Sequence, residues 1–317
     1  MSTYHSRTID AAKGKWRGIL MSIGIPGECL NNKHGPCPLC DGTDRFRWDN
    51  QDGKGSYICG QCGAGWGMDL AMKFTGKTFP EIASEIDMLL GNKKFEPDQV
   101  RPPMSEDDRL SALRAVSAQS VKLTQSTLGH AYFVSRGIGE IAYPKSLRFV
   151  PALRDGEGGV RPCVLATVQG PDGENVTLHR TFLRADGLAK ADMPSPRKLM
   201  PGPIPDGSCV ALSDYTGGPL GIAEGIETAM SASRLYDLPV WAAINAGMME
   251  KWNPPEGCDE VAVFGDHDAK FGGQAAAYRL AHRLAVKGLS VTVHIPQIEG
   301  HDWNDALLLA RPLEEAA

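Results

Sequence analysis

The sequence predicts a multi-domain protein whose C-terminal part is an α/β domain, with a mostly parallel sheet covered by helices on both faces. Three observations support this prediction. The chain has 317 residues, enough for two or three domains of ordinary size. Two closely spaced cysteine pairs near the N-terminus indicate a small metal-binding ribbon. After residue 213, short apolar runs alternate with helical patterns, as they do in parallel sheets that are buried on both faces.

The cysteine pairs follow the spacing C-x2-C-x18-C-x2-C, which is typical of a zinc ribbon. Four thiolates close the coordination shell of a zinc ion, so we expect a structural zinc site and not a catalytic one. The expected ligands are Cys37, Cys40, Cys59 and Cys62. His34 lies three residues before the first of them and could replace one ligand.

Arginines and aromatic residues lie on the segment between the cysteine pairs. DRFRWD and SYIC predict two short strands that are joined by the turn NQDGKG. Aromatic rings can stack on the bases of single-stranded nucleic acid, while arginines reach phosphates or base edges. Because strand residues alternate between two faces, about half of these side chains must face the ribbon core. We expect Arg45, Arg47 and Trp48 to contact DNA.

Composition along the chain predicts the domain boundaries. A ribbon domain with flanking helices covers residues 1–95, and a linker rich in proline and charge covers 96–107. An α+β subdomain follows at 108–212, and the α/β domain occupies 213–312. The subdomain begins with a helix over roughly 106–126 and continues in short strands.

Charge is distributed unevenly along the chain. The net charge is −5, and residues 201–317 carry 7 Lys and Arg against 16 Asp and Glu. Such a segment repels phosphate unless a cation intervenes, so a divalent metal is the obvious mediator, although an acidic surface would give the same count. No apolar run approaches the roughly 20 residues of a membrane span, and the N-terminus lacks an apolar signal region. We therefore expect a cytoplasmic protein.

Acidic residues follow three of the predicted strands in the C-terminal domain. Glu224 ends the run LGIAEG, Asp266 and Asp268 follow VAVFG, and Asp302 and Asp305 lie in HDWND after the last strand. Ligands of open parallel sheets bind at the carboxyl ends of the strands, so these side chains should converge. Carboxylate oxygens suit Mg²⁺ or Mn²⁺. The sequence therefore predicts a second metal site.

These motifs resemble a known family. AEGIET, GDHDAKFGG and HDWND look like the Toprim domain of phage- and plasmid-type DNA primases. CPLC, YICGQCGAGWGMDLAM and FPEIASEI resemble the zinc-binding domain that precedes Toprim in such primases, including the DnaG type. LHRTFLRADGLAKA and RKLMPG resemble the region ahead of Toprim in the same group. The resemblance covers nearly the whole chain.

The resemblance implies roles for the acidic residues. Those that match the catalytic, metal-binding positions of Toprim are Glu224, Asp266, Asp268 and Asp302. Asn304 and Asp305 match a less certain part of the last motif. The chain departs from the family at His267, where members often have a small or neutral residue, and at Lys270-Phe271, which extend the following turn.

The activity that the resemblance implies is synthesis of short RNA primers from NTPs on single-stranded DNA, by metal-dependent nucleotidyl transfer. The ribbon would then grip the template. Basic residues ahead of the acidic motifs would hold the triphosphate and the template; the candidates are Arg180, Arg184, Lys190, Arg197 and Lys198. We expect Arg180, Lys190, Arg197 and Lys198 to bind the nucleotide.

A phosphate-binding loop is the other motif to consider. Gly76-Lys77-Thr78 ends like one, but Ala71 stands where its first glycine is needed. Without such a motor we expect a separate replicative helicase as a partner.

Two alternatives compete with the primase reading. A Toprim-type nuclease would use the same acidic residues to cut DNA, and a zinc-ribbon DNA-binding regulator would have no catalytic activity. A topoisomerase needs a nucleophilic tyrosine in a large separate domain, for which the chain is too short.

Overall fold

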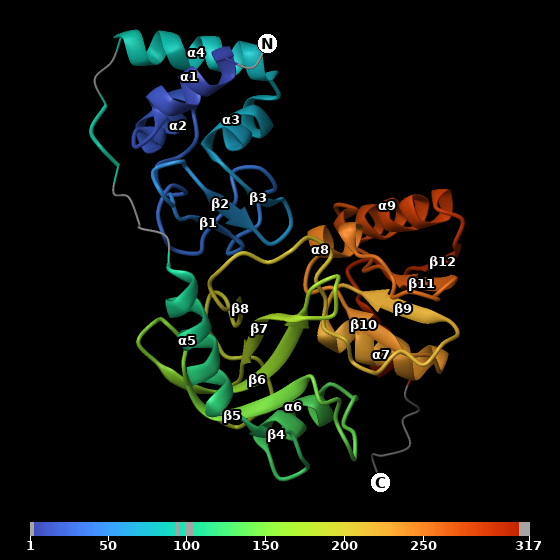
Figure 1. Cartoon of the computed structure of the whole chain (residues 1–317). Helices are drawn as coiled ribbons and strands as arrows, with labels where there is room; N and C mark the ends of the chain where they lie inside the picture. Colours follow the sequence, from blue (N-terminus) through green and yellow to red (C-terminus); the bar gives the residue numbers. More distant parts are fainter. Residues whose placement is uncertain (1–2, 93–94, 99–103, 311–317) are drawn as a thin grey trace. The chain divides into compact units, whose positions relative to one another are not determined.

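The computed structural model describes residues 3–92, 95–98 and 104–310. The chain divides into two compact units, Met1–Ser105 and Glu106–Ala317, and Figure 1 labels most of their elements.

The first unit contains a small antiparallel sheet and four helices. The three strands are β1 (Phe46–Trp48), β2 (Tyr57–Cys59) and β3 (Gly63–Gly65), in that order in the sheet. In the register of β1 and β2, Phe46 lies opposite Cys59 and Trp48 opposite Tyr57. The helices are α1 (Thr3–Ala12), α2 (Trp16–Ile23), α3 (Gly67–Thr75) and α4 (Phe79–Asn92).

Trp16 at the start of α2 is a buried member of this unit's core. Its indole ring is buried together with Leu70 of α3 and Ile82 of α4. A Cβ atom added to Gly67 would lie 2.2 Å from the Trp16 ring, closer than any real contact. Glycine at the first position of α3 therefore lets this helix approach α2.

The second unit begins with an antiparallel sheet of five strands in the order β4-β5-β6-β7-β8. The strands are β4 (Val121–Lys122), β5 (Leu147–Arg154), β6 (Val160–Gln169), β7 (Asn175–Phe182) and β8 (Arg197–Leu199). Two helices accompany this sheet, α5 (Glu106–Ala118) and α6 (Leu128–Ser135).

The helix predicted over 106–126 is shorter than expected, because it ends at Ala118. Beyond this point Val121 and Lys122 pair with Phe149 and Arg148 of β5. The guanidinium group of Arg148 also donates to the hydroxyl and the carbonyl of Ser120. The chain gains sheet hydrogen bonds here and leaves the helical path.

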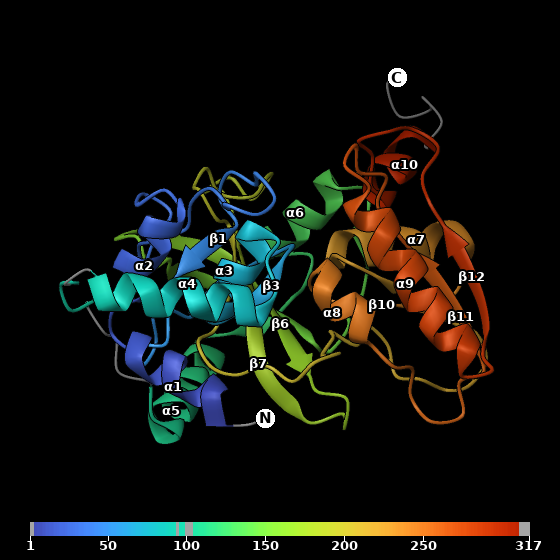
Figure 2. The same cartoon turned by 90° about the horizontal axis from the view of Figure 1, so that it is seen from above.

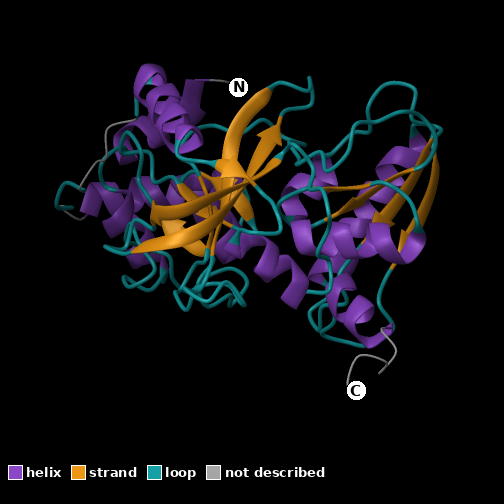
Figure 3. Ribbon diagram, turned by 90° about the horizontal axis from the view of Figure 1, so that it is seen from below, coloured by secondary structure: helices purple, strands orange, loops and turns teal. Residues whose placement is uncertain are grey.

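The C-terminal half of the second unit contains the predicted parallel sheet. Its strands are β9 (Leu220–Ala223), β10 (Val240–Ala242), β11 (Glu260–Phe264) and β12 (Ser290–His294). They are ordered β10-β9-β11-β12, and every neighbouring pair is parallel. The connecting helices are α7 (Ile226–Tyr236), α8 (Ala246–Lys251) and α9 (Gly272–Val286), and α10 (Trp303–Ala310) follows the last strand. Figure 3 shows these strands in orange beside their purple helices.

Helices cover both faces of the parallel sheet (Figure 2). Strand residues alternate between two hydrophobic cores, as the period of a strand requires. One core joins Ile222 and Val263 to α8 and α9, through residues such as Met249 and Leu280. The other core joins the intervening strand residues to α7 and α10; its members include Ala223, Ala262, Phe264, Ala229, Trp303 and Leu307.

Cys209 and Val210 connect the two sheets of the second unit. Cys209 exchanges two backbone hydrogen bonds with Gln169 at the end of β6, and Val210 exchanges two with Ala242 at the end of β10.

The predicted fold class is confirmed: a zinc-ribbon-type sheet, an α+β region and a parallel α/β domain follow one another along the chain. None of the helices in the described part of the chain is long and apolar enough to span a membrane.

Candidate metal centres and active site

The four predicted zinc ligands lie together in the first unit. The sulfur atoms of Cys37, Cys40, Cys59 and Cys62 all lie within 4.8 Å of one another. Two of the sulfur–sulfur distances, Cys37 to Cys62 and Cys40 to Cys59, are 3.8 Å. A tetrahedron with zinc–sulfur bonds of about 2.3 Å has edges of about 3.8 Å, so the group fits tetrahedral zinc.

Backbone amides orient the thiolates. The amide of Leu39 donates to the sulfur of Cys37, and the amide of Cys62 donates to the sulfur of Cys59, each at 3.4 Å. His34 is not part of this group, and its Nδ1 lies 3.2 Å from the carbonyl oxygen of Asp44. The arrangement is a closed four-cysteine site.

The predicted DNA-contacting residues lie on opposite faces of the ribbon. Arg45 is exposed and its guanidinium donates to Gln61 at 2.6 Å, while Arg47 is half-buried and pairs with Asp49 at 3.4 Å. Trp48 is only 5% exposed and belongs to the core. The expectation that Trp48 faces DNA is therefore corrected: in β1 the residues alternate, and the phase places Phe46 and Trp48 inside.

An exposed tryptophan lies at the end of the same sheet. Trp66 follows β3 directly and is 49% exposed, and the ammonium group of Lys54 lies 5.4 Å from the centre of its ring. Ile58 of β2 is 39% exposed and lies opposite Arg47 in the strand register. Trp66 thus offers the accessible aromatic surface that Trp48 lacks.

The predicted acidic residues lie at the carboxyl ends of the parallel strands. Glu224 follows β9 directly, Asp266 and Asp268 follow β11, and Asp302 immediately precedes α10. Because β9 and β11 are neighbours, their ends lie side by side at one edge of the sheet. This is the edge at which open parallel sheets bind ligands.

Asp266 interacts with the other three carboxylates. Burial is the largest cause that raises the pKa of Asp266, to about 8. The next causes are the negative charges of Glu224, Asp302 and Asp268, and Arg197 opposes them. Oδ1 of Asp266 is shielded from solvent and has no hydrogen-bond partner among the described residues. A shielded carboxylate oxygen without a protein partner, within the influence of other negative charges, suits a bound cation.

Helix N-termini fix two of these carboxylates. The amide of Gly273 in the first turn of α9 donates to Oδ2 of Asp268 at 2.7 Å. The amides of Asn304 and Asp305 donate to Oδ1 of Asp302 at 2.7 and 3.0 Å. These hydrogen bonds from backbone N–H groups at helix N-termini hold both side chains in place.

The acidic residues are more widely spaced than the cysteines. Over the described ranges, the cysteines form the only group of three or more potential ligands whose atoms all lie within 4.8 Å. The carboxylates alone do not form a closed cage. Such spacing suits Mg²⁺ or Mn²⁺, which keep waters and share their coordination with substrate phosphates.

Three of the four predicted nucleotide-binding residues already have partners in the protein. Arg180 donates to the carbonyl of Leu199 at 2.9 Å, and its guanidinium lies 5.8 Å from the Phe182 ring centre. Lys190 pairs with a carboxylate on α7 at 3.1 Å. The ammonium group of Lys198 donates to the carbonyl oxygen of Asp155 at 2.9 Å and to the carboxylate of Glu157 at 2.7 Å. Arg184 pairs with Asp186 at 2.6 Å.

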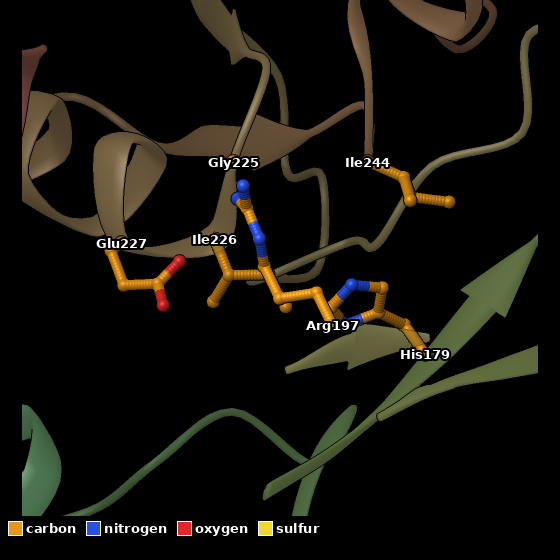
Figure 4. Close-up of a pocket in the computed structure, with 6 residues that line it drawn as sticks. All are labelled: His179, Arg197, Gly225, Ile226, Glu227 and Ile244. Carbon is orange, nitrogen blue, oxygen red and sulfur yellow. The ribbon is translucent and has the colours of Figure 1, made fainter. Parts of the chain in front are cut away.

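Arg197 differs from these residues. Its side chain extends from β8 toward Gly225, the residue after Glu224, as Figure 4 shows. A Cβ atom on Gly225 would lie 4.0 Å from Nη1 of Arg197. Within the described part of the chain, no hydrogen bond or ion pair of this guanidinium group is seen, so it can still bind an anion.

A cavity of about 10 Å³ lies beside Arg197, with room for about one water molecule. The residues that line it are His179, Arg197, Gly225, Ile226, Glu227 and Ile244. His179 is buried, and burial together with the charge of Arg197 lowers its pKa to about 4. His179 is therefore neutral at neutral pH and adds no charge to the site.

Glu227 is a residue of this site that the sequence did not single out. It lies in the first turn of α7 and is 6% exposed. It pairs with Lys190 at 3.1 Å and accepts a hydrogen bond from the hydroxyl of Tyr132. Burial alone would raise its pKa, but Lys190, Arg197 and this hydrogen bond hold the pKa well below its usual range. Only the acidic motif AEGIET itself could have indicated it.

Comparison with protein families assigns three segments of the chain. A model described as the zinc-binding domain of primase-helicase matches residues 32–68. A domain of unknown function (DUF7146) matches residues 107–212. The Toprim domain matches residues 219–311, which include all four acidic residues.

Solved structures of primases are similar to the chain. The Aquifex aeolicus primase, with its zinc-binding and RNA polymerase domains, is 17% identical, with 98% of this chain and 83% of that chain covered and a TM-score of 0.43. The primase fragment of the bacteriophage T7 primase-helicase is 15% identical, with coverages of 87% and 94% and a TM-score of 0.40. A DnaG primase catalytic domain bound to single-stranded DNA is 12% identical, with coverages of 64% and 76% and a TM-score of 0.40.

The chain is thus a zinc-ribbon protein with a Toprim domain. A zinc-binding domain of the primase-helicase type thus lies ahead of a Toprim domain, in the order that the resemblance to DnaG-type primases predicts.

Proposed function

We propose that this protein is a DNA primase that synthesises short RNA primers from NTPs on a single-stranded DNA template. The observation that carries the proposal is the convergence of carboxylates around Asp266 at the ends of parallel strands. The primase-type zinc-binding domain and the Toprim domain in the same chain support it.

The residues that would hold divalent cations are Glu224, Asp266, Asp268 and Asp302. Mg²⁺ or Mn²⁺ bound there would lower the pKa of the attacking 3′-hydroxyl and neutralise the triphosphate. The carboxylates provide only oxygen ligands, and the shielded Oδ1 of Asp266 lacks a protein partner among the described residues. Both features favour a hard divalent cation over zinc.

Arg197 is our candidate for binding the triphosphate. It reaches the turn after Glu224, and its charge acts on Asp266. A guanidinium group can bind two phosphate oxygens at once, which fixes a nucleotide more firmly than a point charge does. Arg180, Lys190 and Lys198 would support this site by keeping β8 and α7 in place.

The ribbon would contact the template through Arg45, Arg47 and Trp66. Arginines reach phosphates, and the exposed indole of Trp66 offers a stacking surface for a base. A separate helicase would deliver the single strand. The Gly76-Lys77-Thr78 segment does not match a phosphate-binding loop, because it follows helix α3 and not a strand, and Ala71 stands where the first glycine is needed.

A primer-synthesis assay tests the proposal. Purified protein is incubated with single-stranded DNA, labelled NTPs and Mg²⁺, and short labelled products are expected. Asp266→Ala should abolish them. The matched control is Asp259→Asn, an exposed aspartate next to β11 that lies outside the acidic group and should retain full synthesis.

The same assay decides between the alternatives. Shortened DNA without labelled products would identify a nuclease that uses the same carboxylates. DNA binding without either product would identify a regulator. If Asp266→Ala synthesises primers at the wild-type rate, Asp266 does not bind a cation that the reaction needs.

A further inference from the structure

His267 separates the two aspartates that follow β11, and it is tied to the loop that carries Asp302. This loop, residues 295–302, connects β12 to α10. The amide of His267 donates to the carbonyl of His301 at 3.0 Å, and the amide of Gly300 donates to the carbonyl of His267 at 2.7 Å. The imidazole Nδ1 lies 2.8 Å from the carbonyl oxygen of Pro296.

The side-chain bond has a defined direction. A carbonyl oxygen can only accept, so Nδ1 of His267 carries the hydrogen and donates it to Pro296. The three bonds hold both ends of the loop: the imidazole binds its beginning, and the backbone of His267 binds its end. Only the first of these bonds depends on the side chain.

The neighbouring carboxylates are fixed on different helices. Asp268 is held by α9, through the amide of Gly273 and a pair of hydrogen bonds with Gln274. Asp302 is held by the first turn of α10. Asn304 in turn binds α10 to Ser231 of α7. The place of Asp302 relative to the β11 carboxylates is therefore set by two attachments, that of α10 to α7 and that of the loop to the end of β11.

We propose that His267 is a positioning residue that sets the place of Asp302 relative to Asp266 and Asp268, and thereby the affinity of this site for divalent cations. The inference rests on the proposed function, since it assumes that these carboxylates share a cation. Loss of a residue that orients metal ligands typically lowers metal affinity about 10- to 100-fold. His267 acts through the loop and not as a ligand.

Substitutions separate the side-chain bond from other effects. Asparagine places an N–H donor close to the position of imidazole Nδ1, whereas glutamine places its amide farther out and alanine has no donor. We expect His267→Asn to retain the bond to Pro296 and His267→Ala and His267→Gln to lose it. His282→Ala is the matched control, because His282 is an exposed histidine of α9.

The primary measurement is Mn²⁺ binding to the full chain without nucleotide or DNA, followed by electron paramagnetic resonance. His267→Ala and His267→Gln should bind Mn²⁺ about tenfold or more weakly, while His267→Asn and His282→Ala stay within about twofold of wild type. Primer synthesis by His267→Ala should need more Mg²⁺ for half-maximal rate, and saturating Mg²⁺ should restore the rate.

The result that overturns the inference is equal Mn²⁺ affinity in His267→Ala and wild type, or equal weakening in the asparagine and glutamine variants. If His267→Ala does not fold, the asparagine–glutamine comparison decides alone. If the proposed function alone is wrong, the variants keep the predicted order of Mn²⁺ affinity but wild type makes no primers.

Discussion

The ammonium nitrogen of Lys190 lies 3.1 Å from Oε1 of Glu227. Lys190 belongs to the segment after β7, and Glu227 lies in the first turn of the helix that follows the acidic residue Glu224. The ion pair therefore joins the antiparallel sheet to the helix whose N-terminus borders the proposed active site. Tyr132 of α6 donates to the same carboxylate oxygen.

Replacing Glu227 by glutamine should destabilise the protein at neutral pH. The folded-state pKa of Glu227 is depressed, so its contribution is present above the unfolded-state pKa and is lost as pH falls through the folded-state value. At pH 7 we expect wild type to be more stable by about 1–3 kcal/mol. The difference should shrink below about pH 4.3. Urea unfolding at pH 7 and pH 3 measures the free energy of unfolding of wild type and variant. If the difference between them is larger at pH 3 than at pH 7, the pKa of Glu227 is not depressed in the folded state.

The pKa of Asp266 predicts pH-dependent metal binding. Without metal this carboxyl has a pKa of about 8, so at pH 7 it is mostly protonated and a cation must displace the proton. Apparent Mn²⁺ affinity should rise by about tenfold per pH unit below this pKa and level off above it. Mn²⁺ titrations from pH 6 to pH 9 test this. A flat profile would show that Asp266 releases no proton on binding.

Replacing Arg197 by alanine should raise KM for NTPs. A hydrogen bond between charged groups contributes about 1.5–3 kcal/mol, which corresponds to a rise of about 10- to 100-fold. Lys198→Ala is the matched comparison, because Lys198 is held by Asp155 and Glu157. We expect its KM to be nearly unchanged and its thermal midpoint to fall. Steady-state kinetics measures both KM values. A KM that rises in Lys198→Ala and stays unchanged in Arg197→Ala would assign nucleotide binding to Lys198 and not to Arg197.

The two ribbon tryptophans should respond differently to replacement by alanine. Trp66→Ala should weaken binding to single-stranded DNA by about 1–3 kcal/mol, because an exposed stacking surface is lost. Trp48→Ala should instead destabilise the first unit by about 3–5 kcal/mol, because a buried ring is removed. Fluorescence anisotropy with labelled DNA and thermal unfolding separate the two effects. Zinc content, measured in parallel, should stay unchanged in Trp66→Ala.

Sequence periodicity was sufficient to predict the parallel sheet and the strand ends that carry the acidic residues. Apolar runs such as those before Glu224 and Asp266 are long enough to indicate buried strands, and the edge at which they end follows from their direction. The cysteine spacing was equally informative, because a tetrahedral site restricts which positions can meet.

Other features depend on contacts between distant residues. A strand of three residues such as β1 does not reveal the phase of its alternation, so the burial of Trp48 could not be predicted. β8 carries Arg197 and Lys198, and charged residues gave it no strand pattern. Glu227 is an ordinary helix residue until Tyr132, 95 positions earlier in the chain, contacts it.

The four backbone hydrogen bonds of Cys209 and Val210 determine how the second unit can move. They bind this short segment to the ends of β6 and β10 at once, with N–O distances between 2.7 and 3.0 Å. The two halves of the unit therefore cannot open about a hinge at this point without breaking sheet pairing. The amide protons of Cys209, Val210, Gln169 and Ala242 should accordingly exchange with solvent as one cooperative group.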